Sequence, residues 1–129
     1  MSGEAEARRT RVMIVEDHAD FRDIMKVLLE GHPDIELLAK AGSLFEARAY
    51  AARFKLDVAV LDLGLPDGNG ADLIADLRRV SHDVRVLILS ASLEPEGIEK
   101  ARSAGADEIL DKLTPVEEIL ATVRRLGNG

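Results

Sequence analysis

One stretch of the chain decides the fold: residues 58–70 have the sequence VAVLDLGLPDGNG. The apolar run Val58–Leu61 is typical of a strand buried in a parallel sheet, because such strands are covered on both faces. Asp62 follows at once, and the residues after it, up to Gly70, are rich in glycine and other residues that favour turns. The pattern predicts a carboxylate at the carboxyl end of a parallel strand, where open α/β sheets bind their ligands.

Strand and helix patterns alternate along the whole chain. Apolar runs predict strands at residues 12–15, 35–39, 58–62, 84–89 and 109–110. Each run precedes a stretch with apolar residues three or four positions apart, which predicts helices that include residues 21–29, 44–54, 70–77, 95–104 and 115–123. This rhythm predicts an α/β fold: a single doubly wound (βα)5 domain, with a five-stranded parallel sheet and helices on both faces.

Local signals mark several of the predicted helix ends. Residues 43–46 (SLFE) form a capping box, in which a serine and a glutamate satisfy free backbone N–H groups at a helix start. Pro95 suits the first turn of the fourth helix, and Gly105 suits its end. Residues 114–117 (TPVE) predict a second capping box, with Pro115 at the first helical position.

The composition favours one domain with an aliphatic core. The chain has 129 residues, of which 47% are hydrophobic and 32% charged, a balance that suits a single domain. We expect that domain at residues 11–126, between a mobile N-terminal arm at 1–10 and a tail or truncated linker at 127–129. The absence of cysteine excludes a disulfide scaffold and thiolate metal sites.

The net charge of −7 disfavours direct nucleic-acid binding, which needs clustered lysine and arginine. No apolar stretch has the length of a bilayer span, and no signal-peptide pattern opens the chain. We therefore expect a cytoplasmic protein with no membrane contact. His18, His32 and His82 share no ligand spacing, so we expect solvated histidines rather than a metal site.

Charged and hydroxyl residues follow four of the five predicted strands. They are Glu16, Asp17, Asp62, Ser90 and Lys112. Because a parallel sheet brings the carboxyl ends of its strands to one edge, these side chains are expected to meet. Two carboxylates about 4 Å apart would repel by roughly 4 kcal/mol at an effective dielectric constant near 20. A hard divalent cation such as Mg²⁺ relieves that repulsion through oxygen ligands.

The predicted cluster suits chemistry at phosphorus. Asp62 can act as a nucleophile, while Lys112 and the metal share the charge of the phosphoryl oxygens and Ser90 donates to one of them. Each residue also has a purely structural interpretation. Asp62 could form a turn, the acidic pair 16–17 could cap a helix, Lys112 could pair with a neighbouring carboxylate and Ser90 could be a satisfied hydroxyl. Their convergence at one edge favours the chemical interpretation.

Over residues 11–126 the sequence resembles the receiver domain of two-component response regulators. The resemblance rests on residues 16–17 (ED), 60–66 (VLDLGLP) with Gly70, 90–91 (SA), and 104–107 (AGAD) before Lys112. It implies the flavodoxin-like fold of the chemotaxis regulator, with strand order 2-1-3-4-5. It also implies a phosphoacceptor module of a phosphorelay, which catalyses only its own phosphorylation and dephosphorylation and is not otherwise an enzyme.

The resemblance implies a Mg²⁺ site of four residues. Asp17 would ligate the ion directly, and Glu16 would help through water. The phosphoacceptor Asp62 and the backbone carbonyl of Gly64 would supply further ligands.

The resemblance also implies how a phosphate becomes a signal. A sensor histidine kinase or phosphotransfer protein would donate the phosphoryl group to Asp62. Lys112 would contact that group, and Ser90 would be the switch hydroxyl. The output surface would combine the fourth helix, fifth strand and fifth helix. It would meet an effector domain, a protein partner, or a second copy of the chain in a homodimer that forms on phosphorylation.

Two positions depart from the family pattern. Many members carry Tyr or Phe three residues before the lysine, whereas this chain has Ile109, so an aromatic flip cannot report the switch. Many members also have proline directly after the lysine, often with a cis bond. Here residues 113–114 (LT) intervene before Pro115, so we expect no cis bond after Lys112.

Two other functions fit parts of the pattern. Haloacid-dehalogenase-like phosphohydrolases also use an aspartyl nucleophile, but they need a second aspartate two residues later, where this chain has Gly64. A degenerate receiver would be a phosphate-independent interaction module, which the presence of Asp62, Asp17 and Lys112 disfavours. The cognate kinase, the stimulus and the output remain open at this point.

Overall fold

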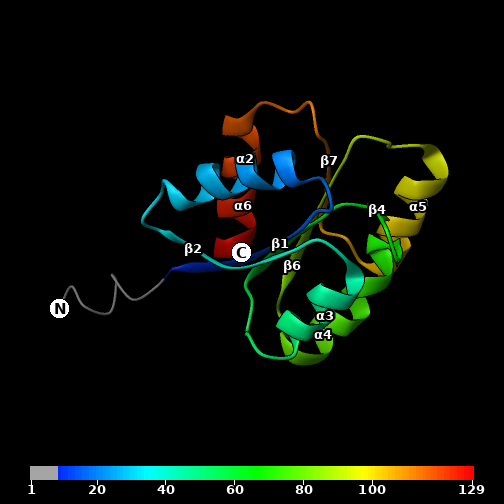
Figure 1. Ribbon diagram of the computed structural model, residues 1–129, viewed down its shortest axis with the longest axis horizontal. Helices are drawn as coiled ribbons and strands as arrows, with labels where there is room; N and C mark the ends of the chain where they lie inside the picture. The colour runs from blue at the N-terminus through cyan, green and yellow to red at the C-terminus, as the bar shows by residue number, and fades with distance from the viewer. Residues whose placement is uncertain (1–8) are drawn as a thin grey trace.

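The computed structural model describes residues 9–129 and contains one central parallel sheet (Figure 1). Its strands are β1 (Thr10–Val15), β2 (Ile35–Ala41), β3 (Val58–Leu61), β6 (Arg85–Ser90) and β7 (Glu108–Asp111). They lie in the order β2-β1-β3-β6-β7. All four neighbouring pairs are parallel. The predicted strand order 2-1-3-4-5 is therefore confirmed.

Helices cover both faces of the sheet (Figure 1). One face carries α2 (Ala19–Glu30) and α6 (Val116–Asn128), and the other carries α3 (Leu44–Ala51), α4 (Ile74–Val80) and α5 (Pro95–Ala104). Successive strand residues alternate between the two layers: Val12 and Ile14 of β1 pack toward α2 and α6, whereas Met13 and Val15 pack toward the other helices. This double burial explains why the strands are continuously apolar.

The segment after Asp62 is more ordered than the predicted loop. It forms a small antiparallel hairpin from β4 (Gly64–Leu65) and β5 (Gly68–Asn69), followed by the 3₁₀ helix η1 (Gly70–Leu73) before α4. Gly70 is required at the base of this hairpin, because a Cβ atom there would lie 1.9 Å from the backbone oxygen of Asp62. The hairpin therefore folds tightly back onto the end of β3.

The predicted helix ends are largely confirmed, with one correction. Ser43 accepts a hydrogen bond from the Glu46 N–H (3.1 Å), although the Glu46 carboxylate accepts from Gly42 N–H rather than from Ser43. Pro95 begins α5, and Gly105 ends it in the left-handed conformation (φ 104°). The second capping box is wrong: Pro115 itself is the N-cap residue of α6, with an extended ψ of 143°, and no side chain caps that helix.

Residues 127 and 128, which the sequence analysis assigns to a tail or truncated linker, belong to α6, because this helix continues to Asn128. Gly127 allows this, since a Cβ atom there would lie 2.5 Å from Thr10 Cγ2 and glycine lets the helix end pack closely on β1. Most of the predicted arm, residues 1–10, lies outside the described residues, and Thr10 is the first residue of β1. Across residues 9–129, none of the helices combines the length and apolar character that crossing a membrane requires.

The inward faces of two helices differ in part from the predicted stripes. Met25 and Leu29 of α2 are buried, but Ile24 is 53% exposed. Val116, at the start of α6, is 44% exposed. The apolar stripes of α2 and α6 are therefore buried only in part, and Ile24 and Val116 stay at the surface.

Candidate functional site

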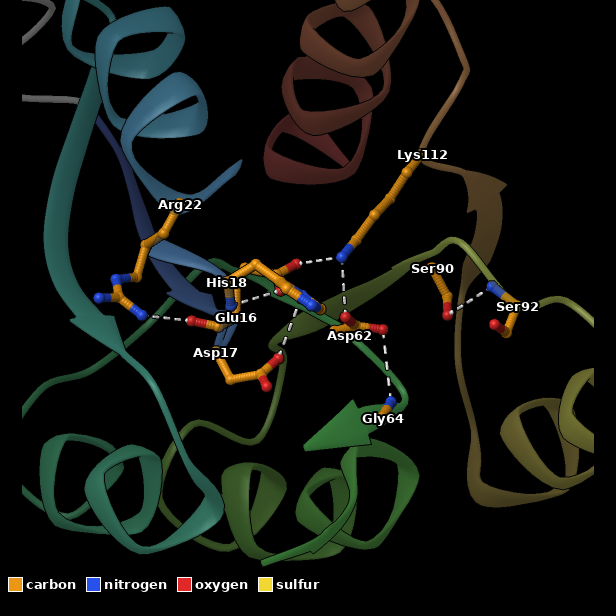
Figure 2. A network of polar contacts seen from close by, with 9 residues as sticks. All are labelled: Glu16, Asp17, His18, Arg22, Asp62, Gly64, Ser90, Ser92 and Lys112. Atoms are coloured by element: carbon orange, nitrogen blue, oxygen red, sulfur yellow. Dashed lines mark hydrogen bonds and ion pairs between the residues drawn. The ribbon is translucent and has the colours of Figure 1, made fainter. Parts of the chain in front are cut away.

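Two buried carboxylates meet at the carboxyl edge of the sheet (Figure 2). Glu16 directly follows β1 and is 2% exposed, and Asp62 directly follows β3 and is 6% exposed. The sheet hydrogen bonding continues through both residues: the Glu16 N–H donates to Ala41 O (2.8 Å), and the Asp62 N–H donates to Val15 O (3.0 Å). Neighbouring strands thus hold the two acids side by side, as the sequence predicted.

Lys112 joins the two carboxylates (Figure 2). Its Nζ lies 2.6 Å from Glu16 Oε1 and 2.9 Å from Asp62 Oδ2, and its side chain is only 12% exposed. The residue follows β7, and its N–H donates to Ser90 O (3.1 Å), which fixes the lysine backbone beside the end of β6. The Phe21 ring, on α2, lies 4.8 Å from Nζ and covers the ammonium with its face.

The electrostatic balance keeps Lys112 charged. Burial alone would lower the pKa of its ammonium, but the hydrogen bonds and negative charges of Glu16 and Asp62 outweigh it and raise the pKa above the ordinary lysine value. The lysine therefore supplies a permanent positive charge between two acids that would otherwise repel.

Four side chains form a group that could hold a metal ion. One ligand atom from each of Glu16, Asp17, His18 and Asp62 lies within 4.8 Å of the others. Asp17 and His18 are the exposed members of the group, whereas Glu16 and Asp62 are buried. Carboxylate oxygens are the donors that a hard divalent cation prefers, so the acids present fit Mg²⁺.

His18 is the member of this group that the sequence interpretation missed. Its side chain is 70% exposed, as expected of a loop histidine, yet Nδ1 lies 3.0 Å from Glu16 Oε2 and 3.4 Å from Asp17 Oδ1. The His18 N–H also donates to Glu16 Oε2 (3.0 Å). Its position directly after the acidic pair was the only available signal. Arg22 was missed as well: its guanidinium donates to the backbone oxygen of Glu16 (2.6 Å).

Ser90 and Gly64 lie near Asp62 at the same edge of the sheet (Figure 2). Ser90, at the end of β6, is 3% exposed, and its Oγ accepts a long hydrogen bond from the Ser92 N–H (3.4 Å). The Gly64 N–H donates to Asp62 Oδ1 (3.3 Å), and a Cβ atom on Gly64 would meet nothing within 4 Å. The structure therefore places both residues at the same edge as Asp62 and leaves open space beside Gly64.

The family departures near Lys112 have simple structural consequences. Ile109, in β7, is partly buried and packs against the core on the α3–α5 face of the sheet. The described residues contain no cis peptide bond, so the bond after Lys112 is trans. Leu113 is 91% exposed, and its N–H donates to Asp111 Oδ1 (2.7 Å). Asp111 therefore caps this turn and is not the partner of Lys112.

The family model described as the response regulator receiver domain matches residues 12–124. Among curated proteins, the DNA-binding transcriptional activator DevR/DosR of Mycobacterium tuberculosis is 37% identical over 92% of this chain and 55% of its own length. The chain spans about half the length of the curated relatives that it matches.

Solved structures agree with this match. The signal receiver domain of the response regulator NarL from M. tuberculosis has a TM-score of 0.87 and 29% identity, with 95% of this chain and 98% of that chain covered. A response regulator protein from Burkholderia pseudomallei, solved with a phosphorylated aspartic acid, calcium ion and citrate, has a TM-score of 0.75 and 27% identity, with 92% and 69% covered. Receiver domains generally bind Mg²⁺ at an acidic pocket and interact with histidine kinases and effector domains. The fold, the acidic edge and the family match agree: this chain belongs to the response regulator receiver domains of two-component systems.

Proposed function

We propose that the chain is a phosphoacceptor module that takes a phosphoryl group from a phosphohistidine onto Asp62. One observation carries the proposal: a buried carboxylate at the end of β3 is held by a buried lysine and lies beside two further acids. A phosphorylated aspartic acid in the B. pseudomallei relative supports the same chemistry.

The proposed reaction needs little from the protein beyond position and charge. The P–N bond of the donor phosphohistidine breaks, a P–O bond to the Asp62 carboxylate forms, and the donor leaves as free imidazole. Lys112 already lies 2.9 Å from Asp62 Oδ2, so its ammonium is placed to contact the phosphoryl oxygens. Later hydrolysis returns Asp62. We propose that this self-directed chemistry is the only catalysis by the chain.

We propose Mg²⁺ as the cofactor, held by Asp17, Glu16, Asp62 and the backbone carbonyl of Gly64. The bound ion would neutralise part of the negative charge of the phosphoryl group. The donor set supports this assignment, because three carboxylates converge at the site and the Gly64 backbone lies beside Asp62.

We propose that phosphorylation alters a surface made of α5, β7 and α6, and that a kinase or phosphotransfer protein docks at the Asp62 edge. The effector is a further domain or a separate partner, and a homodimer on phosphorylation is a third outcome. The DNA-binding transcriptional activator among the relatives supports transcription control as the output, and we propose the cytoplasm as the location of the chain. Because the net charge of the chain is −7, we propose no direct contact of this domain with nucleic acid.

Incubation with acetyl phosphate and MgCl₂, followed by intact mass measurement, tests the proposal. The expected result is a mass gain of one phosphoryl group that disappears when EDTA replaces the metal. No mass gain, with the protein folded and Mg²⁺ present, would favour the degenerate receiver. Steady release of phosphate from small phosphate esters would instead favour a phosphohydrolase.

Replacing Ser90 with alanine should separate phosphorylation from switching. The variant should still gain the phosphoryl group, because in the wild type the Ser90 Oγ bonds the Ser92 N–H and not the phosphoacceptor Asp62. A hydrogen bond to a charged group is worth about 2 kcal/mol, so its loss should reduce the equilibrium constant between the switched and unswitched states by more than tenfold. The measurement is the phosphate-dependent change of amide NMR signals in α5 and β7. Ser92→Ala, with an exposed hydroxyl in the same loop, is the matched control. Full shifts in the Ser90 variant would refute the coupling.

A further inference from the structure

The turn of the β4–β5 hairpin is tied to the start of α3 by one carboxylate. Asp67 Oδ1 accepts from the Leu44 N–H (2.8 Å), and Oδ2 accepts from the Phe45 N–H (3.0 Å). A negative charge at a helix start is favourable, because the free N–H groups and the helix dipole both attract it. The hydrogen bond from the Leu44 N–H lowers the pKa of Asp67. Desolvation opposes this shift and the Phe45 N–H adds to it, so that the pKa lies below its ordinary value. The carboxylate therefore stays ionised and binds two backbone groups more than twenty residues away.

The start of α3, which Asp67 contacts, is fixed relative to Glu16 of the proposed metal site. Directly before α3, Ala41 at the end of β2 accepts the N–H of Glu16 (2.8 Å). Ala47 and Ala51 anchor the helix itself in the core. The start of α3 therefore has a fixed position relative to Glu16, and Asp67 links the hairpin to this helix start.

Gly64 lies on the hairpin between Asp62 and Asp67. The base of the hairpin is closed by the Gly70 N–H, which donates to Leu63 O (2.9 Å), and Gly64 pairs with Asn69 across the two strands. The turn itself contacts the start of α3. Gly68 has φ +151°, and a Cβ atom there would lie 2.7 Å from Leu44 Cδ1, so the turn packs closely on the same helix start.

We infer that Asp67 is a positioning residue of the metal site: its bonds to the α3 start hold the hairpin, so that the backbone of Gly64 stays beside Asp62. This inference rests on the proposed Mg²⁺ site. Without the two bonds the hairpin turn keeps its packing against Leu44 but loses its hydrogen bonds to α3, and metal binding must then order it. When a metal ligand must be ordered during binding, the affinity for the metal falls. The loss of contacts that support a metal ligand has the same effect.

Calorimetric titration of the full chain with MgCl₂, without a phosphodonor, tests this role. Asp67→Ala should raise the dissociation constant for Mg²⁺ about tenfold, the lower end of such effects. Ser43→Ala is the matched control: it removes a cap from the same helix start, the bond to the Glu46 N–H, but leaves the hairpin attached. It should lower the melting temperature while keeping the Mg²⁺ affinity of the wild type. Asp67→Asn keeps one acceptor oxygen and should give an intermediate affinity.

Equal Mg²⁺ affinities for Asp67→Ala and Ser43→Ala would overturn the inference, because Asp67 would then serve only as a helix cap. Circular dichroism melts show whether each variant is folded, and Asp67→Asn replaces the alanine variant in the comparison if the latter does not fold. Phosphate uptake by the wild type is scored separately. A chain that binds Mg²⁺ with the predicted order of affinities but takes no phosphate would refute the phosphoacceptor function and leave the positioning role standing.

Discussion

Asp62→Asn should abolish the gain of a phosphoryl group from acetyl phosphate in the presence of Mg²⁺. In the wild type, the P–O bond to the acetyl group breaks, acetate leaves, and a new P–O bond forms to the Asp62 carboxylate. An asparagine amide has nearly the same shape but lacks the negative charge that makes the carboxylate a nucleophile. The variant should remain folded, because Glu16 still lies 2.6 Å from Lys112 Nζ and keeps the ammonium paired. Intact mass measurement on folded protein checks the result.

Asp111→Asn is the matched control for this experiment. Asp111 directly precedes Lys112, at the end of β7, but its carboxylate accepts the Leu113 N–H and is not in the acidic group. This control should keep the full mass gain. A mass gain in Asp62→Asn equal to that of the wild type would place the phosphorylation elsewhere and refute the assignment of Asp62.

The arrangement of strands and acids could be predicted because it depends on short-range patterns. Each buried strand of a parallel sheet is a continuous apolar run, and the sheet itself brings the residues after those runs to one edge. Glu16, Asp62 and Lys112 were therefore found from their positions alone, and the structure places one carboxylate oxygen of each acid within 3 Å of Lys112 Nζ. No knowledge of side-chain direction was needed.

The features that were missed depend on side-chain direction or on distant contacts. The Phe21 ring over Lys112 and the His18 ring against Glu16 follow from how α2 begins, which its apolar stripe does not specify. The Asp67 bonds to α3 join residues 22 and 23 positions apart and carry no sequence motif. The TPVE pattern failed for a similar reason: the pattern matched a capping box, but the path of the chain after Lys112 put Pro115 in an extended conformation.

Lys112→Met should destabilise the metal-free protein strongly. The lysine lies between Glu16 and Asp62, which are 2% and 6% exposed and have ligand atoms within 4.8 Å of each other. Without the ammonium, two such charges repel by about 3 kcal/mol at an effective dielectric constant near 20, and breaking a buried pair typically costs about 3 kcal/mol or more. Methionine preserves most of the apolar volume of the lysine stem. The expected result is a loss of about 3 kcal/mol in the free energy of unfolding, measured with urea in EDTA.

Mg²⁺ should rescue the Lys112 variant more than it stabilises the wild type, because the ion then supplies the positive charge that the lysine provided. Lys100→Met is the control: the Lys100 side chain is 51% exposed and pairs with Asp72 at 3.6 Å, and exposed pairs contribute little. Equal unfolding curves for the wild type and the Lys112 variant in EDTA would contradict the argument. So would equal stabilisation of both proteins by Mg²⁺.

The pH dependence of the Lys112 effect has a definite sign. Its pKa is raised in the folded protein, so the stability it contributes is fully present below the ordinary lysine value and is lost only as the pH rises through the raised value. The difference in unfolding free energy between the wild type and Lys112→Met should therefore be the same at about pH 7 and about pH 9, both below the ordinary lysine pKa. A difference that shrinks between these values would mean that the ammonium loses its proton in the folded site, and that its two acidic neighbours do not hold it charged.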